Sequence, residues 1–183
     1  MNGIPPTRIA LADARWPARW RERLGDAAPA QLTTLGNLDL LALPKTGLFC
    51  SARCPGHAIL SAYDQAARWR DAGRCVISGF HSPVEKECLH ILLRGSQPII
   101  ICPARAIEAM RIPTELRTAF DTGRVLYLSP FAKQPRRVTK ESALRRNEVV
   151  AALADEAYVA HVAAGGQTAR ISKMLAQWGV LLV

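Results

Sequence analysis

Two glycine-containing turns have the composition of phosphate-binding turns. The first, Ser78-Gly-Phe-His-Ser82, follows an apolar segment and precedes a helix that would begin at Pro83. The second, Ala164-Gly-Gly-Gln-Thr168, also follows an apolar segment. Helix N-termini leave backbone N–H groups unpaired and carry partial positive charge, so both turns favour an anion. The candidate phosphate-binding residues in these turns are Ser78, Gly79, His81, Ser82, Gly165, Gly166, Gln167 and Thr168.

Arginine and lysine side chains would supply the charge that such turns lack. Arg53 follows a short apolar segment, and its guanidinium offers a fixed fork of donors for phosphate. The densest basic run has six cations between residues 133 and 146. Since neighbouring positions on a helix point to different faces, part of this charge must be ordinary surface. The candidates in and beside this run are Arg136, Arg137, Lys140, Arg145, Arg146 and Asn147.

The composition indicates a polyanionic partner. The 183 residues carry a net charge of +9, which on a folded domain is typical of nucleic-acid binding. The five cysteines lie mostly in apolar segments, which predicts buried free thiols in a reducing compartment. No Cys-His pair completes a zinc site with Cys50 and Cys54, and we expect no metal. No segment is long and apolar enough for a membrane span, so we expect a cytoplasmic protein.

The sequence offers no catalytic set. We find no Ser/His/Asp or Cys/His combination in a credible activating order. Glu85 and Glu87 are two residues apart on an expected helix and would face different directions. We therefore expect no enzyme activity and no cofactor.

Apolar and amphipathic segments alternate from residue 45 onward. This alternation predicts an α/β fold, a doubly wound and mostly parallel sheet with helices on both faces, whose ligands bind at the carboxyl ends of the strands. The expected strands are 46–50, 74–78, 98–102, 124–129, 156–162 and 179–183. The expected helices are 56–71, 83–94, 104–110, 113–121, 140–155 and 167–177. Residues 1–44, with two tryptophans four apart at Trp16 and Trp20, would form a lead-in arm on a main domain of residues 45–183.

In this order, the segments resemble the DprA/Smf family of DNA-processing proteins. Trp16-Pro17 and Leu35-Gly-Asn-Leu-Asp-Leu-Leu41 are similar to the family's lead-in. Cys50-Ser-Ala-Arg53 stands in the place of its Gly-Ser-Arg, and Ser78 to Glu85 in the place of its Ser-Gly-x-Ala-x-Gly-Ile-Asp turn. Arg146 to Ala154 is similar to its Arg-Asn-Arg-Ile-Ile-Ala-Gly-Leu-Ser segment. Gly165-Gly-Gln-Thr168 matches the last turn loosely.

The resemblance implies an extended Rossmann-like domain that binds single-stranded DNA. It also implies a dimer that helps to load a RecA-type recombinase during natural transformation. By position, Arg53, the turn at 78–82, Arg146 and Asn147 would line the DNA-binding pocket, with Lys140 and Arg145 close by. The chain departs from the family pattern by lacking the glycine before Ser51 and the Ala-x-Gly of the second turn, and a winged-helix-like tail after Val183. We expect a reduced or divergent member.

The leading hypothesis is a non-enzymatic single-stranded DNA-binding protein. Its basic loops and helix N-termini would hold phosphates, with a role in DNA uptake or recombination. The alternative is a nucleotide-binding or phosphoribohydrolase-like Rossmann domain that acts on or senses a small nucleotide. A structural module that works only with a protein partner is a third reading. The sequence leaves open a RecA-type partner and a homodimer.

Overall fold

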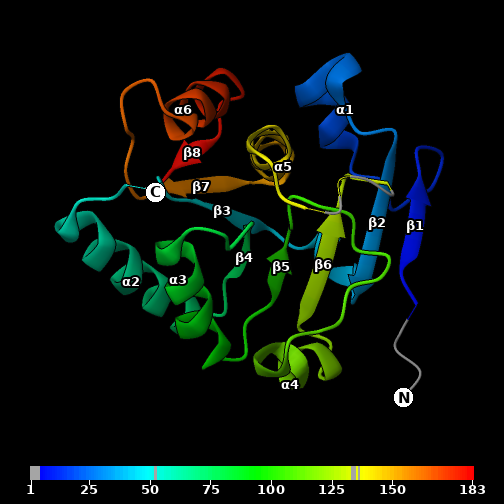
Figure 1. Cartoon of the computed structure of the whole chain (residues 1–183), viewed down its shortest axis with the longest axis horizontal. Helices are drawn as coiled ribbons and strands as arrows, with labels where there is room; N and C mark the ends of the chain where they lie inside the picture. The colour runs from blue at the N-terminus through cyan, green and yellow to red at the C-terminus, as the bar shows by residue number, and fades with distance from the viewer. Residues whose placement is uncertain (1–4, 52, 133–134, 136) are drawn as a thin grey trace.

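The computed structural model describes the chain apart from residues 1–4, 52, 133–134 and 136. Within this part, the strands form one eight-stranded sheet in the order β1-β2-β6-β5-β4-β3-β7-β8 (Figure 1). Strands β3 to β8 pair in parallel, whereas β1 and β2 are antiparallel at one edge. The strands are β1 (Thr7–Ala10), β2 (Gln31–Gly36), β3 (Lys45–Phe49), β4 (Cys75–Ser78), β5 (Ile99–Ile101), β6 (Val125–Ser129), β7 (Glu156–Val159) and β8 (Leu181–Leu182).

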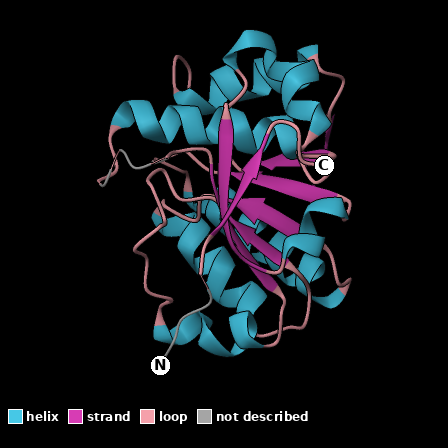
Figure 2. Cartoon of the chain, turned by 90° about the vertical axis from the view of Figure 1, so that its right-hand side faces the viewer, coloured by secondary structure: helices cyan, strands magenta, loops and turns pink. Residues whose placement is uncertain are grey.

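Helices cover both faces of the sheet, which gives a three-layer α/β fold (Figures 1 and 2). Helices α2, α3 and α4 pack on one face, and α1, α5 and α6 on the other. The helices are α1 (Ala18–Leu24), α2 (Gly56–Asp71), α3 (Pro83–Leu93), α4 (Arg117–Asp121), α5 (Lys140–Leu153) and α6 (Gln167–Gln177), with short 3₁₀ helices η1 (Gly25–Ala27), η2 (Leu38–Ala42) and η3 (Thr114–Leu116).

The apolar pattern of each element explains its layer. Ala58, Ala62 and Ala66 recur every four residues along α2, so the helix lays a buried stripe of small side chains on the sheet. Strand β5 is Ile99-Ile-Ile101, and all three side chains are buried because both faces of this central strand are covered. These elements form the cores on either side of the sheet.

The strand order reverses at β3. The chain moves outward from β3 through β4 and β5 to β6, and then crosses back through α5 to place β7 on the other side of β3. The carboxyl ends of β3 and β7 therefore form the topological switch point, where doubly wound sheets bind their ligands.

The predicted α/β fold with a doubly wound, mostly parallel sheet is confirmed, and α2 and α6 have the predicted bounds. The predicted helix at 104–110 is wrong, since this segment forms turns after β5. Strands β1 and β2 were not predicted. They add to the same sheet as the later strands, and the division of the chain at residue 44 stays a prediction.

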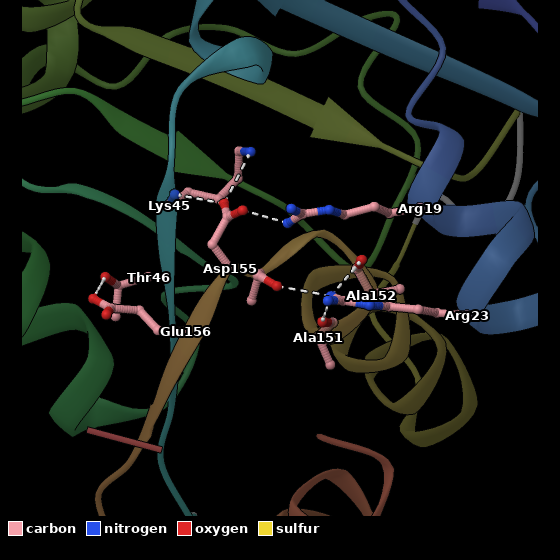
Figure 3. Close-up of polar contacts among 9 residues, drawn as sticks. Arg19, Arg23, Lys45, Thr46, Ala151, Ala152, Asp155 and Glu156 are labelled. Atoms are coloured by element: carbon pink, nitrogen blue, oxygen red, sulfur yellow. Dashed lines mark hydrogen bonds and ion pairs between the residues drawn. The ribbon is translucent and has the colours of Figure 1, made fainter. Parts of the chain in front are cut away.

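An ion-pair cluster at the amino ends of β3 and β7 holds the N-terminal helix in place (Figure 3). The Asp155 carboxylate accepts a hydrogen bond from the Lys45 backbone N–H at 2.8 Å and pairs with the Arg19 guanidinium. Arg23 donates to the Ala152 and Ala154 carbonyls at 3.1 and 2.7 Å, in the last turn of α5 and at its C-cap. The cluster therefore joins α1, α5 and β3 at the edge opposite the expected site.

Candidate nucleic-acid interface

The carboxyl ends of the parallel strands carry most of the predicted binding residues. Because parallel strands end at the same edge, the loops after β3, β4, β5, β6 and β7 share this edge (Figure 1). Arg53 follows β3 and is exposed, and the 78–82 turn follows β4. Arg137 lies exposed in the loop after β6, and the second glycine turn lies beyond β7.

An open pocket of about 590 Å³ lies at the switch point. Arg53 and His161 provide its polar groups, and the remaining lining is apolar or weakly polar. Partial burial raises the pKa of the Cys54 thiol, which keeps it protonated at neutral pH. The lining residues are Arg53, Cys54, Pro55, Ile59, Pro83, Val84 and His161. Such a pocket suits a flat apolar group with an anion beside it.

The first predicted turn is held together by its own polar groups. The Ser78 hydroxyl is fully buried, donates to the Leu48 carbonyl at 2.8 Å and accepts from the Phe80 N–H at 3.3 Å. Phe80 is buried with φ +47°, a left-handed conformation that is costly for a bulky residue. Ser78 therefore shapes the turn rather than presenting its hydroxyl to a ligand.

The amino end of α3 already holds an anion, the carboxylate of Glu85. This buried side chain accepts from the His81 and Ser82 N–H groups at 2.9 and 3.1 Å, and from the Cys50 N–H at 3.1 Å. Ser82 completes a capping box by accepting from the Glu85 N–H. The expectation of an open phosphate site at this helix is corrected, because the protein's own carboxylate fills it. The His81 side chain is exposed nearby.

Arg146 is the buried cation of the interface. Its side chain is only 4% exposed, and Nη1 donates to the Cys102 carbonyl at 3.2 Å at the end of β5. Within the described residues, no carboxylate pairs with this guanidinium and its Nε has no hydrogen-bond partner. A Cβ added at Gly79 would overlap the guanidinium, so a side chain at residue 79 would displace the end of Arg146. Gly79 and Arg146 are therefore brought together, as the sequence predicted for one site.

The other cations of the basic run separate. Arg145 pairs with Glu148 at 3.4 Å and donates to the Ala27 carbonyl, so it points toward the N-terminal segment and away from Arg146. Lys140 is exposed in the first turn of α5. The prediction for Arg136 lies outside the described residues.

The second predicted turn leaves its helix end open. Gly165 has φ +71°, which permits the tight turn, and Gly166 is the N-cap of α6. Within the described residues, no side chain caps α6, and its first turn has no acidic residue. Thr168 is buried and accepts from the Ala163 N–H, whereas Gln167 is exposed and accepts from Asn147 at 3.4 Å. Of the two predicted helix ends, α6 is the one open to an anion.

In the described part of the chain, no group of three or more His, Cys, Asp or Glu side chains could hold a metal ion. No helix there has the length and apolar character that crossing a membrane requires.

Burial raises the pKa of the Cys102 thiol to about 12, although nearby Arg146 acts in the opposite direction.

The chain matches a protein family along most of its length. The model of the DNA recombination-mediator protein A family matches residues 7–176, nearly the whole chain. The chain belongs to this family. The match covers the lead-in segment as well as the main sheet, so the DNA recombination-mediator protein A domain here includes β1 and β2. No curated protein gives a significant match.

Two solved structures share the fold of this family member. DNA processing protein A from Streptococcus pneumoniae has a TM-score of 0.72 at 20% identity, covering 97% of this chain and 70% of that one. DNA processing protein A from Helicobacter pylori has a TM-score of 0.75 at 17% identity, covering 97% and 79%. The H. pylori structure describes a single-stranded DNA binding mode of that protein.

Sequence reasoning missed two features of the site. The role of Glu85 had a readable signal, because Ser82 and Glu85 have the spacing of a capping box. No sequence signal indicated that His161 lines the pocket, since only the pairing of β3 with β7 brings it near Arg53.

Proposed function

We propose that this chain binds single-stranded DNA across the carboxyl edge of its sheet without catalysing a reaction. The observation that carries the proposal is Arg146, a buried guanidinium with no carboxylate partner in the described residues. A buried charge without a counter-ion is costly, and a phosphate at this edge would offset that cost. Membership of a recombination-mediator family and the DNA-binding relative from H. pylori support the same ligand.

Phosphate contacts would supply most of the affinity. Exposed Arg53, Arg137 and Lys140 surround the edge that Arg146 underlies, and the open end of α6 adds partial positive charge. The apolar lining of the switch-point pocket offers a surface for one base, without the several polar groups that would read its identity. Binding would therefore depend strongly on salt and weakly on sequence.

Membership of the family supports a proposal for the cellular role. We propose that the DNA-bound protein delivers the strand to a RecA-type recombinase in DNA uptake or recombination, in the cytoplasm. A homodimer would place two such edges on one DNA strand and raise the apparent affinity through multivalency.

Fluorescence anisotropy with labelled oligothymidine at two salt concentrations tests DNA binding. We expect Arg53→Ala and Arg146→Lys each to weaken binding about tenfold, since a hydrogen bond to a charged group contributes roughly 1.5 kcal/mol or more. Arg94→Ala is the matched control, because Arg94 is an exposed arginine after α3, at the opposite edge of the sheet. Circular dichroism checks that each variant is folded. Absence of wild-type binding at low salt contradicts the proposal.

A small nucleotide is the second candidate, and the size of the switch-point pocket favours it. At about 590 Å³, the pocket lies in the range of small-molecule sites. None of its seven described lining residues is a carboxylate, which a phosphoribohydrolase would need. Competition with mononucleotides separates the candidates. Displacement of the oligonucleotide at micromolar mononucleotide favours the second one.

A further inference from the structure

The loop after β5 is fastened to the loop after β6. Ser129, the last residue of β6, is fully buried and its hydroxyl donates to the Arg105 carbonyl at 2.8 Å. The same oxygen accepts from the Phe131 N–H at 3.2 Å. The Ala106 N–H donates to the Pro135 carbonyl at 3.0 Å, which forms a second link between the loops. The backbone at residues 105–106 is therefore held in a fixed position at the carboxyl edge.

The Arg105 side chain projects from this fixed backbone. It is exposed, and within the described residues it forms no ion pair with a carboxylate. The nearest acidic residue along the loop, Glu108, instead pairs with Arg8 at 3.7 Å. Arg105 thus offers an exposed guanidinium, without an ion-pair partner among the described residues, on a backbone held by hydrogen bonds, which reduces the entropy lost on binding a phosphate.

By its position after β5, Arg105 adds a third cation to those that follow or lie over the ends of neighbouring strands. Arg53 follows β3, Arg146 lies over Gly79 at the end of β4 and bonds to Cys102 after β5, and Arg105 comes three residues later. Neighbouring strands are about 4.8 Å apart, so the ends of β3, β4 and β5 span roughly 10 Å. This span exceeds what one phosphate group can contact.

We propose that Arg105 is a second phosphate-binding residue and that Ser129 positions it. The ligand would then be a polymer that lies across the ends of β3, β4 and β5, with a base at the switch-point pocket and a later phosphate at Arg105. The inference rests on the proposed DNA binding and extends it, because it assigns the path of the strand across the sheet edge and a residue outside the pocket.

The test compares labelled thymidine dinucleotide, which has a single internucleotide phosphate, with labelled oligothymidine of about 16 nucleotides, over a salt series. For Arg105→Ala, we expect about fivefold weaker binding of the longer oligonucleotide, with a slope of log K against log salt smaller by about 0.7. The shorter oligonucleotide, which fills the pocket alone, should bind as to wild type. Arg94→Ala removes the same charge at the opposite edge and should leave both affinities within about twofold.

A second variant tests whether Ser129 positions Arg105. Ser129→Ala keeps the net charge but removes the hydroxyl that holds Arg105, so it should weaken the longer oligonucleotide by about threefold and leave the shorter one unchanged. If Arg105→Ala behaves like Arg94→Ala with the longer oligonucleotide, the role of Arg105 is refuted while DNA binding stands. If the wild-type protein binds neither oligonucleotide, the proposed function itself fails.

Discussion

The guanidinium of Arg146 lies against the backbone of Gly79, in the space that a side chain at residue 79 would need. These residues are far apart in sequence, and one comes from a turn after β4 and the other from α5. The missing side chain allows a long, charged side chain to reach the carboxyl edge while it stays buried. Gly79 thus serves the site by making room for a cation.

Replacing Gly79 with alanine tests this arrangement. The added Cβ would overlap the Arg146 guanidinium, so we expect a loss of about 1–3 kcal/mol in the free energy of unfolding, as for overpacked sites. DNA affinity should fall to a similar extent as in Arg146→Lys. Urea denaturation and anisotropy measure the two effects. Gly56→Ala is the stability control, because nothing lies within 4 Å of its added Cβ. Equal stability of both variants would contradict the packing argument.

The Glu85 carboxylate should be essential for the first turn. Glu85→Gln keeps the size of the side chain but gives an amide group, which cannot accept from the Cys50, His81 and Ser82 N–H groups together. We expect a loss of about 1–3 kcal/mol in the free energy of unfolding, measured by urea denaturation. In comparison, Glu87→Gln removes a surface contact to His90 and should change it by less than about 0.5 kcal/mol.

Because of Asp155, the free energy of unfolding should depend on pH in the acid range. Burial acts to raise the pKa of its carboxyl, but the hydrogen bonds from the Lys45 N–H and Arg19 outweigh burial, and the pKa is lowered. A lowered folded-state pKa stabilises the fold above the unfolded-state value, about 3.9, and this contribution is lost as pH falls through the folded-state pKa. The stability difference between wild type and Asp155→Asn should therefore be constant near neutral pH and shrink below about pH 4.

Urea titrations at several pH values measure that difference. The exposed Asp64→Asn variant provides the matched control and should show a small difference at every pH. A difference between wild type and Asp155→Asn that grows toward low pH would contradict the assignment.

Trp20 should make the N-terminal segment part of the cooperative fold. Its indole is fully buried, donates to the Val149 carbonyl at 3.1 Å and packs edge-on against Trp16. We expect Trp20→Ala to cost about 3–5 kcal/mol and Trp20→Phe less, because the phenyl ring retains much of the packing. Thermal unfolding followed by circular dichroism should remain a single transition in both variants. A separate early transition would instead support the division at residue 44.

Much of the fold could be predicted because its signals are local. Gly73 and Gly123 have φ of +69° and +75° and follow α2 and α4, the position at which a glycine commonly ends a helix. The segment 104–110 was wrongly predicted as a helix because Ile107 and Met110 have the three-residue spacing of a helix face. Its backbone is instead held by Ser129, at the end of β6, and by Pro135, in the loop that follows. Long-range contacts of this kind leave no local pattern.

The candidate site was predictable in its parts and less so in its arrangement. Arg145 and Arg146 are identical, adjacent residues, so the sequence does not indicate that their side chains lie in different surroundings. Only the packing of α5 on the sheet buries Arg146 near Gly79 and turns Arg145 toward Ala27. Likewise, Ser78 has a residue type that binds phosphate, but its hydroxyl serves the turn.

The pairing of β2 with β6 has a consequence for synthesis on the ribosome. Thr33 lies opposite Ser129, so β2 can pair with β6 only after the ribosome has synthesised almost a hundred further residues. Until residue 129 emerges, β2 cannot pair with β6, and its apolar side chains stay outside the main sheet. Trp20 is covered later still, because its hydrogen-bond partner Val149 is synthesised after β6. Folding of this chain during translation should therefore finish late, and the N-terminal segment is where a nascent chain would need protection from aggregation.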